Sequence, residues 1–315
     1  MPAPKMQPLE TPPKRTVPKP TPPPKPGGRT AAAPKPTRTF KVSPWTGEGE
    51  GEKIIAYGDT GIGKTTLMSM LPNPIFIGVD DGGRRIVNPK TDKPVDHVPG
   101  IDTFEDVRAA IHQPNLFPAG SSCVIDTLTR VEVLAERFVL DTIPKASKGK
   151  GAVVLAKNLK DYGYNEGSSH VRDTFRMLLQ DLDTLIRRGV NVGMICQEQA
   201  ITVANPEGSD YLRACPRLHH DKQYSTMLEV CEWADHILRV GYLRTMVDIE
   251  ADRSVGKAQS DATRAIFVGG AQDFLAKSRT LGLFVDDDGS PVSCVSFANP
   301  ADGTIWEYIF DQEGE

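Results

Sequence analysis

A glycine-rich run that begins at Gly58 has the residue types and spacing of a phosphate-binding loop. It matches the pattern G-x-x-x-x-G-K-[ST], followed by one more threonine, and consists of Gly58, Asp59, Thr60, Gly61, Ile62, Gly63, Lys64, Thr65 and Thr66. Its glycines let the backbone curl so that successive N–H groups point at phosphate oxygens. We expect Lys64 to reach the β- and γ-phosphates and the Thr65 hydroxyl to hold Mg²⁺. The pattern therefore predicts a site for a nucleoside triphosphate.

The segments on either side of this loop are those that would position it. Residues 53–57 are mainly apolar and predict a buried strand running into the loop. Residues 65–71 predict a helix leaving it. The loop then lies between a strand end and a helix start, where the positive end of the helix dipole adds to the attraction for phosphate.

A second apolar run ends on a carboxylate. Residues 122–127 predict a buried strand that delivers Asp126 to its carboxyl end, beside the phosphate loop. There Asp126 can hold a water on Mg²⁺. Between the two runs the sequence predicts a strand at residues 75–79, an acidic turn that includes Asp80 and Asp81, and a helix at about residues 103–112.

A long amphipathic helix and a further strand follow. The apolar stripe of residues 168–188 predicts a helix packed on the core. Residues 190–196 predict a buried strand that ends on Gln197. An amide there is placed to contact the γ-phosphate, with a solvated strand end as the alternative. The alternation of apolar strands and amphipathic helices predicts an α/β protein with a mainly parallel sheet covered by helices.

The first 47 residues differ in composition from the rest. Residues 1–44 hold 14 of the 26 prolines, nine basic residues and one acid, so they carry +8 while the remainder carries −12. Such a segment has few backbone donors and little to bury, which predicts a disordered tail at residues 1–47. The tail is either a tether or a contributor to binding nucleic acid or a partner. We expect no signal peptide and no membrane partner, because no apolar stretch is long enough.

The five cysteines form no closely spaced pair, which fits reduced thiols in a cytosolic compartment. A zinc site is the alternative for four residues whose spacing matches no common finger: Cys215, His219, His220 and Cys231.

The order of these elements resembles that of the RecA-like ATPases, and within them the small phage ATP-binding proteins of the Sak type, which are predicted single-strand annealing or recombination ATPases. The resemblance runs from residue 53 to about residue 281. It rests on the phosphate loop, the acidic-Gly-Gly turn after the second strand, Val124-Ile125-Asp126-Thr127-Leu128-Thr129, Asp161-Tyr162-Gly163-Tyr164, Gln197 and Ala276-Lys277-Ser278-Arg279. It implies a three-layer RecA-like P-loop NTPase domain at residues 48–284, with ATP and Mg²⁺ as cofactors and hydrolysis of ATP to ADP and phosphate.

The same resemblance assigns roles to single residues. Asp81 takes the place of a catalytic glutamate that polarises the attacking water, although its side chain is one methylene shorter. Gln197 takes the place of the γ-phosphate sensor. Lys277 and Arg279 are either an exposed, solvated basic pair at the end of a helix that begins near residue 271 or, as the resemblance implies, a basic pair that reaches into the nucleotide site of a neighbouring copy. That role implies a homo-oligomer, either a ring or a filament.

Two segments fall where RecA-like proteins place mobile DNA-binding loops. Residues 200–223 contain Arg213, Arg217, His219, His220 and Lys222, and residues 145–169 contain Lys145, Lys148, Lys150, Lys157 and Lys160 with Tyr162 and Tyr164. Cations with interleaved aromatic rings suit single-stranded DNA. Two solvated loops are the alternative.

The functional hypothesis is an ATPase, in the cytoplasm of a bacterial host if phage-encoded, that acts on single-stranded DNA in recombination, annealing or repair. Phage single-strand-binding or replication proteins are further expected partners. An ATP-dependent loader or packaging accessory shares the nucleotide motifs, and a small-molecule phosphotransferase is a third reading.

Residues 285–315 predict a C-terminal β extension with strands through residues 306–310. Its acidic turn, Asp286 to Asp288, is read as a hairpin turn, with calcium as the alternative.

Overall fold

The computed structural model describes residues 42, 49–79, 81–145, 154–246, 258–280, 289–290, 292–297, 299 and 301–310. Within these ranges, the side chains of Asp81 and of residues 244–246 and 258–262 are not described. Most of the expected tail, Asp80, the cations Lys148 and Lys150, and the acidic turn at residues 286–288 lie outside the described residues.

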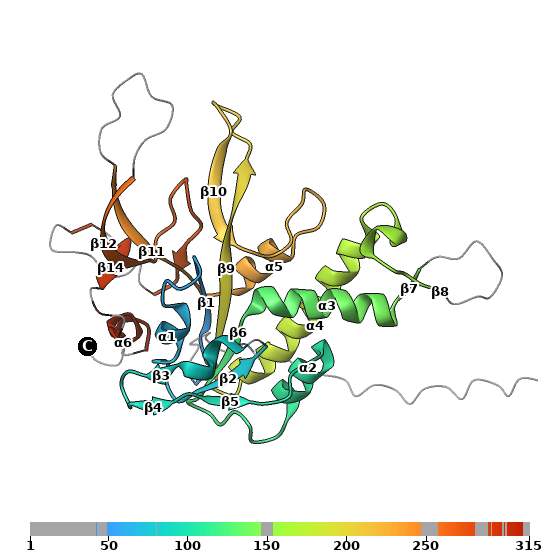
Figure 1. Cartoon of the computed structure of the whole chain (residues 1–315), viewed down its shortest axis with the longest axis horizontal. Coiled ribbons are helices and arrows are strands. Elements are labelled where there is room, and N and C mark those ends of the chain that lie inside the picture. Colours follow the sequence, from blue (N-terminus) through green and yellow to red (C-terminus); the bar gives the residue numbers. More distant parts are fainter. Residues whose placement is uncertain are drawn as a thin grey trace, which may run out of the picture. The chain divides into compact units, whose positions relative to one another are not determined.

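A ten-stranded sheet forms the centre of the molecule (Figure 1), and its main path runs β14-β12-β11-β1-β9-β6-β2-β5. The six strands from β11 to β5 are parallel, whereas β12 and β14 extend the sheet in antiparallel fashion, as do β10 beside β9 and β13 beside β11. These strands are β1 (Lys53–Gly58), β2 (Pro74–Gly78), β5 (Asp96–Val98), β6 (Ser122–Asp126), β9 (Asn191–Val203), β10 (Tyr211–Pro216), β11 (His236–Met246), β12 (Ala258–Phe267), β13 (Lys277–Ser278) and β14 (Cys294–Phe297).

Helices cover both faces of this sheet. They are α1 (Lys64–Met68), α2 (Phe104–His112), α3 (Leu128–Thr142), α4 (Glu166–Ile186), α5 (Thr226–Trp233) and α6 (Thr304–Phe310). Short elements complete the described chain: the 3-10 helices η1 (Asp81–Arg85) and η2 (Leu159–Tyr162), and the strand pairs β3 (Val87–Asn88) with β4 (Lys93–Pro94) and β7 (Pro144–Lys145) with β8 (Val154–Leu155).

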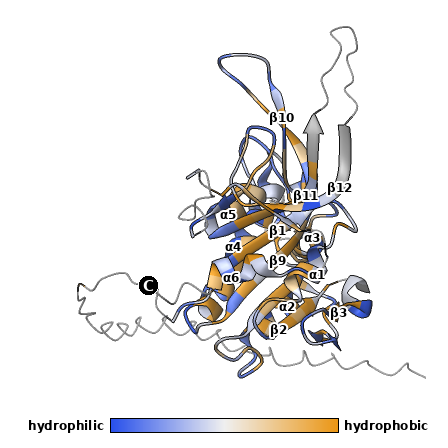
Figure 2. Ribbon diagram, turned by 90° about the vertical axis from the view of Figure 1, so that its left-hand side faces the viewer, coloured by the Kyte–Doolittle hydropathy of each residue, from blue (hydrophilic) through white to orange (hydrophobic). Residues whose placement is uncertain are grey.

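Two hydrophobic cores result, one on each side of the sheet. Ile55 and Tyr57 of β1 face the core shared with α2, α3, α4 and α5, while Ile54 and Ala56 face the core shared with α1 and α6. This division follows from the alternation of side chains along a strand. Figure 2 shows the central strands as the apolar centre between more polar surroundings. The three-layer α/β fold with a mainly parallel sheet, predicted from the sequence, is confirmed.

The expected strand and helix positions agree with the structure at most sites. Helix α4 lies within two residues of its predicted bounds, and Gly189 follows it in the left-handed conformation (φ 76°). Thr103 begins α2 with a reciprocal cap, since its side chain accepts from the Asp106 N–H and the Asp106 carboxylate accepts from the Thr103 N–H.

Two expectations about secondary structure are wrong. Strand β9 does not end at Cys196 but continues to Val203, because β10 folds back and pairs with it. The C-terminal residues 304–310 form helix α6 rather than strands. Trp306 and Ile309 lie one helical turn apart, so both are buried against the α1 side of the sheet.

Helix α6 is also held by a hydrogen bond, since Trp306 Nε1 donates to the Leu67 carbonyl at 3.0 Å. Residues 47–315 form one compact unit, to which β14 and α6 belong. The boundaries expected at residues 47 and 284 stay predictions.

Candidate active site

The phosphate loop joins the carboxyl end of β1 to the start of α1. Gly63 is the N-cap of α1 and has φ 108°, a conformation that a residue with a side chain adopts only under strain. Gly58 is fixed by close packing, because a Cβ there would stand 2.2 Å from the Val240 carbonyl oxygen of the neighbouring strand. The two glycines therefore serve the loop's curvature and its approach to β11.

Lys64 is the first residue of α1, and only 5% of its surface is exposed. Its Nζ donates to the carbonyl oxygens of Gly58 (2.9 Å) and Asp59 (2.7 Å) and lies 3.4 Å from Gln197 Oε1. Burial lowers the pKa of Lys64, and the Asp126 carboxylate opposes that shift. Within the described chain its hydrogen-bond partners are carbonyl and amide oxygens, so no carboxylate binds the ammonium directly. An anionic ligand would supply the missing counter-charge.

Thr65 and Asp126 lie together as the sequence predicts. The Thr65 Oγ1 donates to Asp126 Oδ2 at 3.0 Å, and Asp126 is buried at the carboxyl end of β6. A hydroxyl and a carboxylate oxygen are ligands that suit Mg²⁺, so these residues fit the expected ion. Such an ion would neutralise charge on the β- and γ-phosphates.

Gln197 contacts the loop from the neighbouring strand. Its Oε1 accepts from Thr60 Oγ1 at 3.2 Å, and the β1–β9 register places it opposite Gly58. Its backbone is equally engaged, since its N–H donates to Thr129 Oγ1 (3.2 Å) and its carbonyl accepts from the Arg217 N–H (2.7 Å). Gln197 is therefore brought to the site as expected, although within a continuing strand rather than at a strand end.

These residues surround a cavity of about 480 Å³, a size within the range of small-ligand sites. Gly82 and Ile86 form part of its lining. Because Gly82 belongs to η1, the backbone at Asp81 is adjacent to the cavity. The Asp81 side chain lies outside the described residues, so its role as the water-orienting carboxylate stays a prediction.

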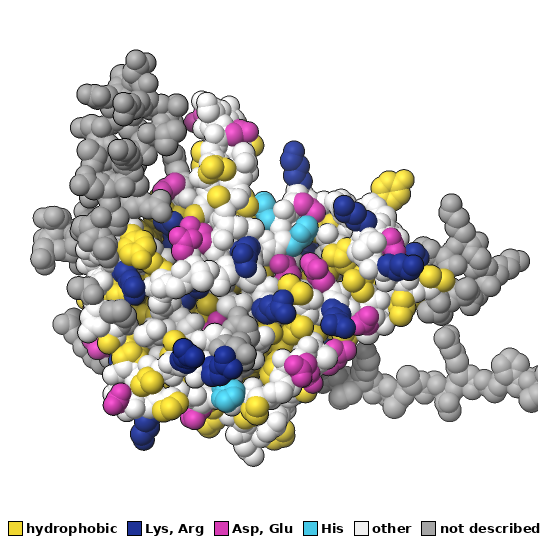
Figure 3. Space-filling view, viewed as in Figure 1, with side chains coloured by type: hydrophobic (Ala, Val, Ile, Leu, Met, Phe, Trp, Pro, Cys, Tyr) yellow, Lys and Arg dark blue, Asp and Glu magenta, His cyan; other side chains and the backbone are white. Residues whose placement is uncertain are grey.

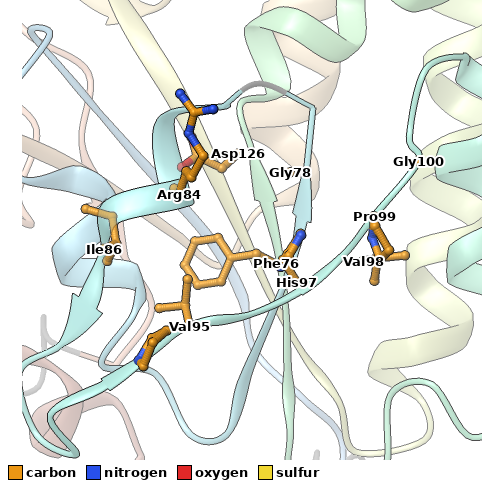
Figure 4. Close-up of a pocket in the computed structure, with 12 residues that line it drawn as sticks. Phe76, Gly78, Arg84, Ile86, Val95, His97, Val98, Pro99, Gly100 and Asp126 are labelled. Atoms are coloured by element: carbon orange, nitrogen blue, oxygen red, sulfur yellow. The ribbon is translucent and has the colours of Figure 1, made fainter.

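A second cavity of about 370 Å³ adjoins the first and shares Ile86 and Asp126 with it. Figure 4 shows the ring of Phe76 in this cavity, with Arg84 beside Asp126. No sequence motif pointed to this space, because its lining comes from β2, η1 and the β4–β5 segment, which are ordinary core and connecting residues.

Lys277 and Arg279 lie at the opposite edge of the sheet. Lys277 pairs with Ile237 near the start of β11, whereas the phosphate loop follows the end of β1. Arg279 NH1 forms an ion pair with Asp235 Oδ1 at 2.9 Å. Within one chain the pair is not brought to the loop, and any contact with a nucleotide would be with that of another copy. The alternative of a helix from about residue 271 is wrong, because residues 271–276 are irregular.

The first of the two expected DNA-binding segments, residues 200–223, is largely the β9–β10 hairpin, which projects beyond the sheet (Figure 1). Arg213 is held by the Gln272 carbonyl and by Tyr211, whereas Arg217 and Lys222 are exposed.

The second segment, residues 145–169, supplies one aromatic ring rather than two. Tyr162 is buried, and its hydroxyl donates to the carbonyls of Val139 and Ile143 (3.0 and 2.6 Å). It therefore cannot stack on a base, and the expectation that it would is wrong. Tyr164 is 99% exposed and keeps that capacity.

The zinc alternative finds no support. Across the described ranges there is no group of three or more His, Cys, Asp or Glu residues that could hold a metal ion. His219 faces Asp221, and His220 faces Ser225. All five cysteines are free thiols. In the described part of the chain no helix combines the length and apolar character needed to cross a membrane.

The phosphate loop, the Thr65–Asp126 pair and the strand order β11-β1-β9-β6-β2 define a P-loop domain of the three-layer α/β class. Residues 50–280 match the family model AAA_24, described as an AAA domain, so the chain belongs to that family.

Among solved structures, a KaiC-like protein from the hyperthermophilic archaeon Pyrococcus horikoshii OT3 is similar at 11% identity, with a TM-score of 0.36 over 79% of this chain and 90% of that one. The comparison with curated proteins gives no match.

Proposed function

We propose that this protein hydrolyses ATP and couples the nucleotide state to single-stranded DNA bound at the β9–β10 hairpin. The observation that carries the proposal is the double engagement of Gln197. Its side chain contacts Thr60 and Lys64 of the phosphate loop, while its carbonyl accepts from the N–H of Arg217 at the base of the hairpin. A change at the γ-phosphate would therefore reach the hairpin through two hydrogen-bonded contacts. The first joins the loop to the Gln197 side chain, and the second joins the Gln197 carbonyl to the Arg217 N–H.

Hydrolysis would proceed by in-line attack of water on the γ-phosphate. Lys64 would neutralise charge on the phosphates, and Asp126 with Thr65 would hold the metal ion. Asp81, on η1 beside the cavity, is the carboxylate we assign to the water. Burial of Lys64 strengthens its attraction to the phosphates, because screening by solvent is weak at a buried site.

The DNA part of the proposal depends on few residues. Figure 3 shows Lys and Arg side chains scattered among Asp and Glu on the face in view, without one continuous basic stripe. Arg217 and Lys222 are exposed near the hairpin base, and Tyr164 is exposed before α4. These residues, with the basic tail, would supply phosphate contacts and a stacking surface, as the resemblance to Sak-type proteins implies.

The test is binding of a fluorescent single-stranded oligonucleotide to the full chain at several salt concentrations. Arg217→Ala/Lys222→Ala should weaken binding and reduce the slope of log affinity against log salt by roughly 0.7 per lost phosphate contact. The matched control, Lys93→Ala/Arg137→Ala, removes two exposed cations elsewhere and should leave the slope close to that of the parent protein. Equal slopes for parent and hairpin variant would reject the hairpin as the DNA site.

A loader or packaging accessory is the second candidate, and one observation favours it. Leu212 is 64% exposed on the projecting hairpin, where an apolar side chain would contribute to a contact with a protein partner. In that case Leu212→Ser would abolish capture of a protein partner and leave DNA binding intact.

A phosphotransferase remains a third reading because the cavity of Figure 4 adjoins Asp126, where a phosphate acceptor would lie. Hydrolysis of ATP in the absence of any added acceptor would argue against it.

We also propose that the active unit is a homo-oligomer, a ring or a filament. Lys277 and Arg279 lie at the edge of the sheet opposite the phosphate loop, and the Arg279 side chain is 66% exposed despite its ion pair with Asp235. This exposure leaves it accessible to the nucleotide site of a neighbouring copy.

A further inference from the structure

A cation outside the phosphate-loop motif contacts the loop from within the same chain. Arg264, in β12, places its NH1 only 3.3 Å from the point where a Cβ on Gly63 would stand. Gly63 is the last glycine of the motif and the N-cap of α1. The guanidinium therefore lies beside the loop at the start of the helix.

The sheet register explains how β12 delivers this side chain. Gly58, the last residue of β1, lies opposite Val240 of β11, and Tyr242 stands two residues beyond Val240. Arg264 pairs with Tyr242 on one side and with Phe297 of β14 on the other. Arg264 is thus fixed between two strands at a level just past the end of β1, where the phosphate loop begins.

The direction of the side chain follows from the pleat. Ile266, two residues along β12, is buried in the core on the α1 side of the sheet. Residues two apart on a strand point to the same face. Arg264 therefore points to the face on which α1 and the phosphate loop lie.

Among the described residues, the charge of Arg264 is not used in an ion pair. Arg239 is bound by Glu198 through two hydrogen bonds (2.9 and 3.2 Å), and Arg279 by Asp235. For Arg264, by contrast, the described side chains include no carboxylate within ion-pair distance. A half-buried guanidinium beside a phosphate-binding loop is suited to bind a phosphate oxygen pair.

The side from which Arg264 approaches indicates which phosphate it would contact. Gln197 and Asp126 come from β9 and β6, on one side of β1, and define the γ-phosphate end of the site. Arg264 comes from β12, on the other side of β1. A triphosphate with its γ-phosphate near Gln197 would extend its α-phosphate toward Arg264.

We propose that Arg264 is an α-phosphate-binding residue supplied in cis, which anchors the nucleoside end of the nucleotide. The inference rests on the proposed ATP site and adds a ligand contact that the loop motif does not contain. Because the α-phosphate is present in both ATP and ADP, the contact would contribute equally to the affinity for either nucleotide.

The experiment measures the dissociation constants of ATP and ADP for the full chain by calorimetric titration. Arg264→Gln should raise both constants by the same factor, about tenfold or more, since a hydrogen bond to a charged group is lost. Arg264→Lys keeps the charge but loses the planar fork, and should fall between the parent and Arg264→Gln. Arg137→Gln, on the exposed side of α3, is the control and should bind both nucleotides like the parent.

Thermal unfolding of each variant shows whether it is folded before titration. Unchanged affinity for both nucleotides would overturn the proposal, and so would a loss for ATP alone, which would place Arg264 at the γ-phosphate. Lys64→Ala, measured in parallel, separates the two hypotheses. If Lys64→Ala binds nucleotide normally, the ATP site itself is wrong, whereas loss in Lys64→Ala with normal binding in Arg264→Gln rejects only the role of Arg264.

Discussion

The two edges of the parallel sheet carry their charged groups in different arrangements. At the amino-end edge, basic side chains are matched by carboxylates in three pairs: Lys53–Asp183 (2.8 Å), His236–Glu52 (3.1 Å) and Arg279–Asp235 (2.9 Å). At the carboxyl-end edge Arg239 is likewise paired, with Glu198 (2.9 Å), whereas Lys64 is held by carbonyl and amide oxygens and Arg264 lies against Gly63.

The difference distinguishes basic side chains that are paired with a carboxylate of the protein, and so stabilise the fold, from basic side chains that have no such partner among the described residues and are suited to bind an anionic ligand. In a salt bridge the carboxylate neutralises the cation. Lys64, by contrast, is buried and its described hydrogen-bond partners are uncharged oxygens. The comparison teaches that the type of partner, more than the presence of a basic residue, indicates a binding role. It also makes Lys277 and Arg279 the most demanding test, because they lie at the amino-end edge and yet resemble catalytic residues.

The largest expected effect is on ATP binding, and it compares one lysine at the carboxyl-end edge with one lysine at the amino-end edge. Lys64→Ala should weaken ATP binding by roughly a hundredfold or more, because phosphate charge is left unneutralised in a buried site. Lys53→Ala removes a lysine paired with Asp183 and should bind ATP with the parent's affinity. Equilibrium titration of both variants checks this, and similar affinities in the two would erase the proposed distinction.

The next effect concerns the basic pair at the amino-end edge. Lys277→Ala/Arg279→Ala should keep ATP binding but lose DNA-stimulated hydrolysis by on the order of a thousandfold, as expected for an arginine-finger role across an interface. Steady-state ATPase assays with single-stranded DNA measure this. If these residues serve only the fold, as in the ion pair of Arg279 with Asp235, the double variant should have a lower melting temperature and normal stimulation by DNA.

Mixing supplies the control for that prediction. Lys277→Ala/Arg279→Ala combined with Lys64→Ala should recover part of the activity, since some interfaces then join an intact basic pair to an intact loop. Absence of recovery, together with a monomeric sedimentation profile in ATP and DNA, would remove the intersubunit role.

A smaller effect is expected at Asp81. Asp81→Asn should retain ATP binding and lose roughly a hundredfold in hydrolysis, the scale of general acid–base contributions. Asp81→Glu restores the longer carboxylate and should hydrolyse ATP at least as fast as the parent. Single-turnover hydrolysis compares the three proteins, and a normal rate in Asp81→Asn would mean that another group orients the water.

The smallest expected effect is on the pH dependence of stability. It concerns Glu132 of α3, which is buried and whose carboxylate accepts from the backbone N–H of His219 (2.9 and 3.0 Å). Burial raises the pKa of Glu132 despite these hydrogen bonds. A raised folded-state pKa stabilises the protein below the ordinary carboxyl range, and this contribution is lost as the pH rises through the folded-state pKa.

Glu132→Gln removes this titration. Above the folded-state pKa it should raise the free energy of unfolding relative to the parent by on the order of 1 kcal/mol. Urea unfolding of both proteins at pH 4 and pH 8 is the check, with the exposed Glu105→Gln as control. A difference between parent and Glu132→Gln that does not change with pH would contradict the assignment.

Much of the fold and the centre of the site could be predicted because their signals are local. The glycine spacing of the phosphate loop, the apolar run ending on Asp126 and the stripe of α4 each follow from a short stretch of sequence. The Thr65–Asp126 hydrogen bond confirms that two such stretches meet.

The failures come from partners that are distant in the sequence. Strand β9 extends past Gln197 because β10 pairs with it, and Tyr162 is buried because α3 offers two carbonyl groups to its hydroxyl. Arg264 was missed because an arginine in an alternating strand carries no local signal. Only the β11–β12 register brings it to Gly63.

The central claim is that the carboxyl-end edge joins an ATPase site to a DNA-responsive hairpin through Gln197. The most direct measurement is the steady-state ATPase rate of the full chain with Mg²⁺, with and without a single-stranded oligonucleotide. The account predicts hydrolysis that rises with DNA in the parent, and a Gln197→Ala variant that still binds ATP but shows no rise. Equal stimulation of the parent and Gln197→Ala, or hydrolysis indifferent to DNA, would contradict it.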